Sequence, residues 1–484
     1  MSKKVLANTI QRCRDKNVII PTYEEMKHPE KIPPRIRKAL KGIGLWDLNP
    51  LNLFRITWKN DVETGGFGRV NFIEFPPEIT GVKARIFALV GKFFPTGAHK
   101  VGATFGPLVS RLVKGEFDPT RQKAVWPSTG NYCRGGAYDS YLLGCHAIAI
   151  LPQGMSRERF EWLKTVGAEV IATPGTESNV KEIYDKCWEL KKTRGDEVVV
   201  LNQFEEFGNP IWHYEVTSAA MLEVLEQELK PGQRLAGVGL STGSAGTIGC
   251  ADALRKKFPT LKVAASEALE CPTLLYNGYG AHRIEGIGDK HIPWIHNVKN
   301  TDVTVGIKDE DTIRIIRLFN EPAGKAWLAR KGVSPKIIEK LALMGISSVC
   351  NLLTAVKLAK YYEMNGNDAV FTICTDSIEM YRSRLKELNE ERGKYTEHHA
   401  AGDYEACLMA QHIDHMQELS YWDRRRVHNL KYFTWVEQQG KTAEELDAQW
   451  FDEKYWDNAL GQARKWDRAI GEFNDKTGVA KKYK

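Results

Sequence analysis

A lysine at a turn before a helix is the feature of this sequence with the clearest chemical potential. Residues 96–100 read Thr-Gly-Ala-His-Lys, between the strand-like run 84–90 and an amphipathic, helix-like segment over 101–113. A lysine placed in this way can present its amine to a cofactor, and a neutral amine acts as a nucleophile or a base. Because most lysines are solvated surface residues, Lys100 must be judged together with other loops.

A loop of small residues over 243–247 could bind an anion. It reads Gly-Ser-Ala-Gly-Thr, follows the strand-like run 235–239 and precedes a helix-like segment over 248–258. Small residues let backbone N–H groups approach an anion, and a helix N-terminus favours negative charge. The loop fits neither the ATP-binding Gly-Lys-Ser/Thr pattern nor the dinucleotide G-x-G-x-x-G pattern. Taken alone, a plain structural turn is an equally good interpretation.

A second loop, Ser128-Thr129-Gly130-Asn131, follows the short apolar run 124–127 and opens another helix-like segment. Its backbone and hydroxyl donors suit a carboxylate, and the Asn131 amide could bond to a phenolic oxygen on a cofactor ring. The alternative is a simple helix cap, since Ser, Thr and Asn are favoured at that position.

The elements around these loops predict an α/β fold with parallel sheets. Short apolar strands alternate with amphipathic helices from residue 84 to 388, which is typical of sheets covered on both faces. We expect strands at 147–151, 169–172, 198–201, 235–238, 262–265 and 369–373, and helices at 157–166 and 179–193.

The two ends of the chain differ from this central region. Residues 1–83 contain proline-rich and aromatic stretches and are predicted to form an ordered arm. Residues 389–484 are rich in charge and tryptophan, with helical spacing and almost no strand signal. We expect a helical extension that packs on the central region or on a second subunit, with an independent helical domain as the alternative.

Composition narrows the class of protein. A chain of 484 residues predicts two or three domains, and no apolar run approaches the roughly 20 residues that cross a membrane. The expected location is therefore cytoplasmic. The net charge of +7 is spread along the chain, which disfavours nucleic-acid binding. Nine scattered cysteines without a C-x-x-C pair fit a reduced protein with neither disulfides nor a metal site.

Six segments, in this order, resemble the cysteine synthase-like family of pyridoxal phosphate enzymes of fold type II. This family includes O-acetylserine sulfhydrylase, cystathionine β-synthase and the tryptophan synthase β chain. The segments are Thr96–Lys100, Ser128–Asn131, Asn202–Glu205 with Asn209-Pro210, Gly243–Thr247, Arg283–Gly288 and Asp376-Ser377. The resemblance covers about residues 84–385.

The resemblance implies a cofactor, pyridoxal 5′-phosphate, and a role for each matching residue. Lys100 would form the Schiff base and then remove the substrate α-proton. The other residues would contact the cofactor ring oxygen (Asn131), the cofactor phosphate (Gly243, Ser244, Ala245, Gly246, Thr247), the pyridine nitrogen (Ser377) and the substrate carboxylate (Ser128, Thr129, Gly130, Gln203). The implied fold has two parallel-sheet α/β subdomains within residues 84–388, and the implied assembly is a homodimer.

The implied reaction is β-replacement or β-elimination on a small amino acid through an aminoacrylate, as in cysteine synthase. A lyase or dehydratase that releases pyruvate and ammonia is the first alternative, and a non-catalytic regulatory subunit is the second. Asp376 leaves open which side chain meets the pyridine nitrogen. Cys133 and Arg134, just after Asn131, depart from the family pattern. Cys133 is predicted to be a small buried residue, with a reactive thiol as the alternative. Arg134 is predicted to face outward and cap a helix, with recognition of a second acidic group on the substrate as the alternative.

Overall fold

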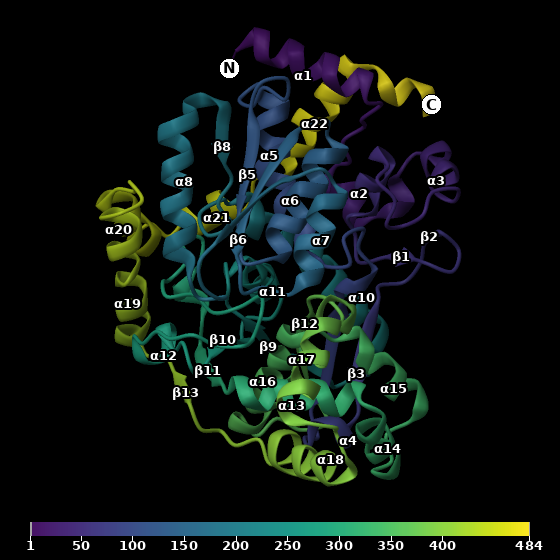
Figure 1. Cartoon of the computed structure of the whole chain (residues 1–484), viewed down its shortest axis with the longest axis vertical. Helices are drawn as coiled ribbons and strands as arrows, with labels where there is room; N and C mark the ends of the chain where they lie inside the picture. The colour runs from purple at the N-terminus through teal and green to yellow at the C-terminus, as the bar shows by residue number, and fades with distance from the viewer. Residues whose placement is uncertain (1, 484) are drawn as a thin grey trace.

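Two sheets form the body of the protein in the computed structural model, which describes residues 2–483 (Figure 1). The larger sheet has the strand order β13-β11-β10-β9-β12-β4-β3, and the smaller one has the order β7-β6-β5-β8. The larger sheet contains β3 (Phe72–Phe75), β4 (Arg85–Val90), β9 (Arg234–Ser241), β10 (Lys262–Ala268), β11 (Val303–Ile307), β12 (Asp368–Cys374) and β13 (Met416–Glu418). The smaller sheet contains β5 (Lys123–Pro127), β6 (His146–Pro152), β7 (Glu169–Thr173) and β8 (Val198–Val200).

All pairs in the smaller sheet are parallel, and in the larger sheet only the edge strands β3 and β13 are antiparallel. The predicted parallel α/β architecture is confirmed. Strand β5 illustrates why these apolar runs become buried strands: successive side chains point to opposite faces, and both faces are covered. Ala124 and Trp126 join the core between the sheets, whereas Val125 joins the core beneath α8.

Helices cover the sheets and fill the space between them. Helix α16 packs on β9 and β12, α8 packs on the smaller sheet, and α5 packs against α6 and α9. The helices of this region are α5 (Lys100–Lys114), α6 (Asn131–Leu142), α7 (Arg157–Thr165), α8 (Val180–Arg194), α9 (Gly208–Trp212), α10 (Ser218–Glu228), α11 (Gly249–Lys257), α12 (Thr273–Tyr276), α13 (Asp309–Asn320), α14 (Pro322–Arg330), α15 (Pro335–Lys340) and α16 (Ile346–Tyr361).

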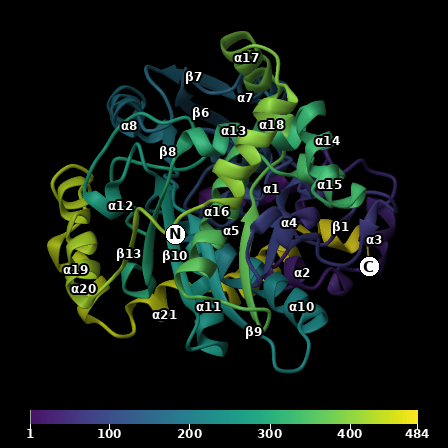
Figure 2. The same ribbon diagram turned by 90° about the horizontal axis from the view of Figure 1, so that it is seen from below.

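The last hundred residues wrap around the body. They contain α17 (Arg382–Arg392), α18 (Glu397–Asp403), α19 (Tyr421–Asn429), α20 (Ala443–Phe451), α21 (Tyr455–Leu460) and α22 (Ala463–Thr477). Helix α22 returns to pack on α1 (Lys3–Asp15), so the two ends of the chain lie side by side (Figures 1 and 2). Arg14 Nε of α1 donates to Thr477 O at the end of α22 at 2.9 Å, which fixes this contact.

Two strands lie in regions where the sequence did not predict them. Strand β3 belongs to the range expected to form an arm, yet it pairs with β4. Strand β13 belongs to residues 389–484, which were predicted to be helical, yet it pairs with β11. A three-residue edge strand reading Met-Gln-Glu carries too little apolar alternation to be recognised.

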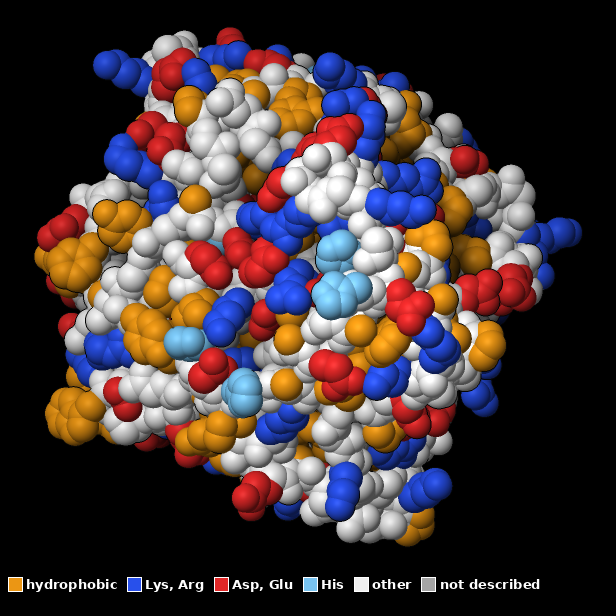
Figure 3. All heavy atoms as spheres, turned by 60° about the horizontal axis from the view of Figure 1, so that its bottom comes forward, with side chains coloured by type: hydrophobic (Ala, Val, Ile, Leu, Met, Phe, Trp, Pro, Cys, Tyr) orange, Lys and Arg blue, Asp and Glu red, His pale blue; other side chains and the backbone are white. Residues whose placement is uncertain are grey.

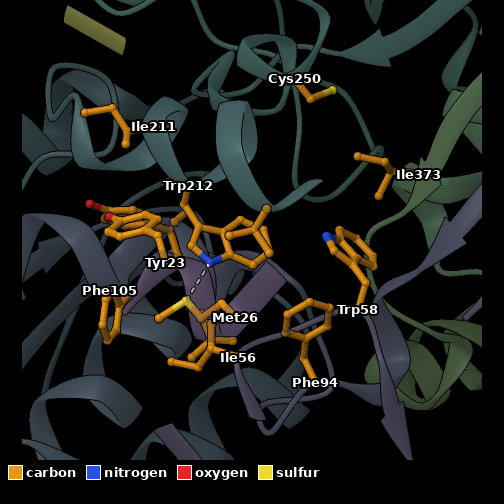
Figure 4. Close-up of a cluster of buried hydrophobic side chains, with 14 of the residues drawn as sticks. Tyr23, Met26, Ile56, Trp58, Phe94, Phe105, Ile211, Trp212, Cys250 and Ile373 are labelled. Atoms are coloured by element: carbon orange, nitrogen blue, oxygen red, sulfur yellow. Dashed lines mark hydrogen bonds between the residues drawn. The ribbon is translucent and has the colours of Figure 1, made fainter. Parts of the chain in front are cut away.

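An aromatic cluster joins the N-terminal region to the middle of the protein. Trp212 is buried, and its Nε1 donates to Met26 Sδ at 3.4 Å (Figure 4). Trp58 and Phe94 pack edge-on with ring centroids 4.9 Å apart. A Cβ on Gly102 of α5 would lie 2.1 Å from the Trp212 ring, so glycine permits this close packing.

The outer surface is mixed in charge, because acidic and basic side chains alternate over the face in Figure 3. Within residues 2–483, no single helix is long and apolar enough to cross a membrane. By length and composition only the bent pair 335–343 and 346–361 could do so, and α16 is buried in the protein.

We predict that Gly102→Ala lowers the free energy of unfolding by about 1–3 kcal/mol, because the new methyl group must displace the Trp212 ring. The matched control is Gly471→Ala in α22, where a Cβ meets nothing within 4 Å. That change should raise stability by about 0.5–1 kcal/mol, since alanine favours helices more than glycine does. Denaturant unfolding of both variants checks the difference, and equal stabilities would contradict the packing argument.

Candidate active site

The predicted loops meet at the carboxyl ends of the strands. Lys100 follows β4, the Thr375–Ser377 segment follows β12, and the 243–247 loop follows β9. These strands are neighbours in the sheet, so the loops converge at one edge, where ligands bind in open α/β sheets. The backbone confirms the meeting, because His99 N donates to Thr375 O at 3.3 Å.

Lys100 is the first residue of α5, and its amine is buried. Its Nζ donates to Ser244 Oγ at 3.2 Å, which joins the loop 96–100 to the loop 243–247. Burial lowers the pKa of Lys100 to about 8, although nearby Asp289 and Glu177 oppose this shift. The amine is therefore far more often neutral near pH 7 than an exposed lysine amine.

The 243–247 loop is shaped by close contacts that only small residues allow. Asn209 Nδ2 donates to Ser244 Oγ at 3.0 Å, and a Cβ on Gly246 would lie 2.0 Å from Asn209 Oδ1. Ala245 adopts the left-handed conformation with φ of 60°, which a larger branched residue would resist. The loop leads through a short 3-10 turn into α11, as an anion cradle requires.

A buried hydrogen-bonded chain joins the two sheets at the site. Asn131 Nδ2 donates to Asp376 Oδ2 at 2.7 Å, and Tyr381 Oη donates to the same oxygen at 2.8 Å. Arg159 Nη2 donates to Tyr381 Oη at 3.0 Å, and its Nε lies 3.5 Å from Glu285 Oε2. This chain holds Asn131 against the loop after β12.

Arg159 also holds the loop 128–131, which is predicted to bind a carboxylate, in its conformation. Its Nη1 donates to Thr129 O at 2.7 Å, and a Cβ on Gly130 would lie only 1.9 Å from that nitrogen. Ser128 Oγ accepts from Gly130 N at 3.0 Å, which tightens the turn before α6. Glycine is therefore required at 130 so that the guanidinium can support the loop.

The remaining predicted residues lie near this centre without direct contacts to Lys100. Gln203 is buried, and its carbonyl oxygen accepts from Asn209 Nδ2 at 3.0 Å. Ser377 is buried beside Asp376, and Thr247 lies half-buried at the start of α11. Hydrogen bonds thus join Lys100 to Ser244 and Ser244 to Asn209, and Asn209 in turn bonds to the backbone carbonyl of Gln203.

The prediction for Arg134 is wrong. Its side chain points inward, with Nε donating to Thr96 O at 2.8 Å and the guanidinium stacked 4.1 Å from the centre of the Trp162 ring. Helix α6 is buried on nearly every face between α5 and the smaller sheet, and Arg134 lies on a buried face. Arg134 supports the loop that carries Lys100. Cys133 is buried, as predicted.

Two acidic side chains near Lys100 were missed by sequence reasoning. Asp289 and Glu177 are buried, and burial raises the pKa of Asp289 to about 7 and that of Glu177 to about 8. Glu177 also lines a cavity of about 210 Å³ that Glu285 and Arg384 border. Perturbed acids in such a position are typical of functional sites.

Comparison with known proteins places the chain in a family. The family described as "Pyridoxal-phosphate dependent enzyme" matches residues 66–326, more than half of the sequence. The chain belongs to this family of enzymes, and its cofactor is pyridoxal 5′-phosphate. Within it the chain is cysteine synthase-like.

Three curated relatives illustrate the similarity. A probable cysteine synthase of Bacillus subtilis is 29% identical over 301 residues, covering 62% of this chain and 89% of the relative. Cysteine synthase B of Campylobacter jejuni is 30% identical over 242 residues, covering 50% of this chain and 71% of the relative. The cystathionine beta-synthase of Saccharomyces cerevisiae is 24% identical over 317 residues, covering 64% of this chain and 59% of the relative.

Solved structures share the fold. A cysteine synthase from Entamoeba histolytica gives a TM-score of 0.57 at 24% identity and covers 70% of this chain and 93% of its own. A hydrogen sulfide-producing enzyme from Fusobacterium nucleatum gives a TM-score of 0.55 at 24% identity, covering 64% of this chain and 95% of its own. The fold is therefore that of fold type II enzymes.

The residues present fit the cofactor. Several buried polar atoms among the described residues lack a hydrogen-bond partner, including Asn131 Oδ1, Ser377 Oγ and Asn209 Oδ1. Such orphaned groups are costly unless a ligand satisfies them. Together with the buried Lys100 amine and the cradle around Gly246, they provide polar contacts for an aromatic ring and a phosphate.

Some missed residues had a sequence signal. Asp289 directly follows the recognised segment 283–288, and Asn209 belongs to the recognised Asn-Pro pair. Arg159 and Tyr381 had none, because they are 222 positions apart and meet only through folding.

We predict that the cofactor-free protein captures pyridoxal phosphate faster as pH rises through about 8. Only the neutral amine attacks the aldehyde, and a lowered pKa makes roughly 10% of Lys100 neutral at pH 7, against less than about 0.1% for an exposed lysine. Stopped-flow absorbance near about 410–420 nm follows the capture. A rate that keeps rising steeply up to the ordinary lysine pKa would contradict the lowered value, and Lys100→Arg should show no capture.

Proposed function

We propose that this enzyme replaces or removes the β-substituent of a small amino acid, in a reaction like that of cysteine synthase. The observation that carries the proposal is the buried Lys100 amine, bonded to the Ser244 hydroxyl at the start of α5. The cysteine synthases among the curated relatives favour replacement by a second nucleophile.

Lys100 is the proposed base in this reaction. Bound pyridoxal phosphate supplies an electron sink for the charge that develops at the substrate α-carbon. Lys100 Nζ takes the α-proton and returns one at the end of the cycle. Burial supports this role, because it keeps a larger fraction of the amine in the neutral form.

Substrate orientation is proposed for the loop 128–131 together with Gln203. Ser128 and Thr129 supply hydroxyl and backbone donors for the substrate carboxylate, and Arg159 holds their loop in place. The phosphate is assigned to Gly243, Ser244, Ala245, Gly246 and Thr247, and the ring oxygen to Asn131.

Ser377 is proposed to face the pyridine nitrogen. Its Oγ has no hydrogen-bond partner among the described residues. Asp376 Oδ1 also lacks one, but Asp376 Oδ2 is held away by the bonds that it accepts from Asn131 and Tyr381. A neutral hydroxyl leaves the ring less protonated than a carboxylate would, which favours loss of a β-substituent over other fates of the carbanion. This supports chemistry at the β-carbon.

Elimination with release of pyruvate and ammonia is the second candidate. Hydrogen sulfide-producing enzymes of the same fold motivate it. The two reactions differ in the fate of the unsaturated product: in replacement a nucleophile adds at its β-carbon, and in elimination the product is released and hydrolysed to pyruvate and ammonia.

We also propose a homodimer, as the resemblance to the family implies.

An amino-acid panel tests the function. We expect O-acetyl-L-serine, L-serine or L-cysteine to change the cofactor spectrum, and O-acetyl-L-serine or L-serine to give L-cysteine when sulfide is added. Lys100→Ala should lower turnover by a factor of about 10³ or more, because the base is lost. Assays of cysteine, sulfide and pyruvate separate the outcomes.

Pyruvate formed at the same rate with and without sulfide would favour the elimination alternative. A protein whose cofactor spectrum responds to none of these amino acids would contradict the proposal. The matched control is Lys181→Ala on the exposed surface of α8, which should leave every rate unchanged.

A further inference from the structure

Asp289 stands out among the buried acids because its charge interacts with that of Lys100 and one of its oxygens has no partner among the described residues. Its Oδ2 has no hydrogen-bond partner among the described residues, and the side chain is 8% exposed. A Cβ built on Gly243 would lie 3.9 Å from that oxygen, so the carboxyl borders the proposed phosphate loop. A buried polar atom without a partner calls for a ligand or a catalytic role.

The backbone around Asp289 is held firmly, which gives the carboxyl a fixed position. Gly288 N donates to Thr242 O at 2.7 Å, and Thr273 Oγ1 donates to Asp289 O at 2.8 Å. These bonds join the loop to the end of β9 and to α12. A catalytic carboxyl needs such support to stay within reach of its substrate.

The groups that face Asp289 come from several elements. Lys100 lies on α5, Glu177 on the loop before α8, Tyr184 on α8 and Cys271 before α12. Of these only Lys100 lowers the pKa of Asp289, and burial outweighs it and brings the pKa to about 7. The carboxyl therefore exchanges protons near neutral pH.

We propose that Asp289 is a second catalytic residue, which gives a proton to the departing β-substituent and takes one from the incoming nucleophile. The inference rests on the proposed function and adds a residue to it. Lys100 is assigned to the α-carbon, and a separate acid lets the substituent take up a proton while Lys100 still holds the one from the α-carbon. The unused Asp289 oxygen supplies the second proton carrier.

The proposed cycle balances in atoms and charge. In the first half the Cα–H bond breaks and its proton passes to Lys100, while its electron pair forms a Cα–Cβ double bond. The bond from Cβ to the substituent breaks, and the substituent leaves with that electron pair and the Asp289 proton. In the second half the nucleophile bonds to Cβ, its proton passes to the Asp289 carboxylate, and Lys100 returns a proton to Cα.

Leaving groups of different basicity test this role. Asp289→Asn keeps the shape of the side chain and removes its exchangeable carboxyl proton. Pyruvate release is measured without an added nucleophile, so that Asp289 is needed only for departure of the substituent. We expect turnover of L-serine or L-cysteine, whose substituents need a proton to leave, to fall about 100-fold or more. Turnover of β-chloro-L-alanine, whose chloride leaves without a proton, should fall less than about 10-fold. Asp289→Glu should recover part of the loss.

Two further measurements separate catalysis from folding. The change in cofactor absorbance on adding L-serine reports binding, and its half-saturation should stay within about 3-fold in Asp289→Asn. The wild-type rate with L-serine should pass through a maximum between pH about 7 and 8 and decline above it, because Lys100 must be neutral while Asp289 must be protonated to donate. Asp289→Asn should lack that decline.

The outcomes are distinct. Equal losses with both kinds of substrate, or no loss with either, would overturn the role of Asp289 while leaving the proposed function in place. A wild-type enzyme that turns over none of these amino acids would instead overturn the proposed function, and this inference with it. The matched control is Asp185→Asn, an exposed acid on α8 paired with Lys181, which should change no rate.

Discussion

The buried amine of Lys100 is the constraint on which the site depends. Taking an ammonium group out of water is costly, so burial lowers the pKa of Lys100 to about 8. Its Nζ donates a hydrogen bond to the Ser244 hydroxyl. Close packing surrounds this partner, because Asn209 Nδ2 donates to the same Ser244 hydroxyl and a Cβ on Gly246 would lie 2.0 Å from Asn209 Oδ1. Burial also raises the pKa of the nearby Asp289 carboxyl, to about 7.

The two sheets contribute different parts of the site, and specific polar contacts keep them together. The larger sheet supplies the lysine and the small-residue loop, and the smaller one supplies the loop that ends at Asn131. The bond between Asn131 and Asp376, backed by Tyr381 and Arg159, links them. The N- and C-terminal regions brace the same body from outside, through the Trp212 cluster and α22. Residues far from the chemistry thus help to set its geometry.

Much of this could be predicted from the sequence, because the signals are local. Strands read as apolar runs, and Lys100, Ser244 and Asn131 each lie in a short motif just after a strand. What could not be predicted depends on contacts between distant segments. The inward turn of Arg134 follows from the burial of α6, and strand β13 is too short to leave a pattern. A role for Asp289 could not be predicted, because only the fold brings it near Lys100.

The central claim is that Lys100 holds the cofactor, and chemical trapping tests it most directly. Borohydride reduction of the purified holoenzyme, followed by peptide mass spectrometry, identifies the lysine that carries the reduced cofactor. The account predicts a single stable adduct on Lys100 and its loss in Lys100→Ala. An adduct on another lysine, or a reduced protein that carries none, would contradict it.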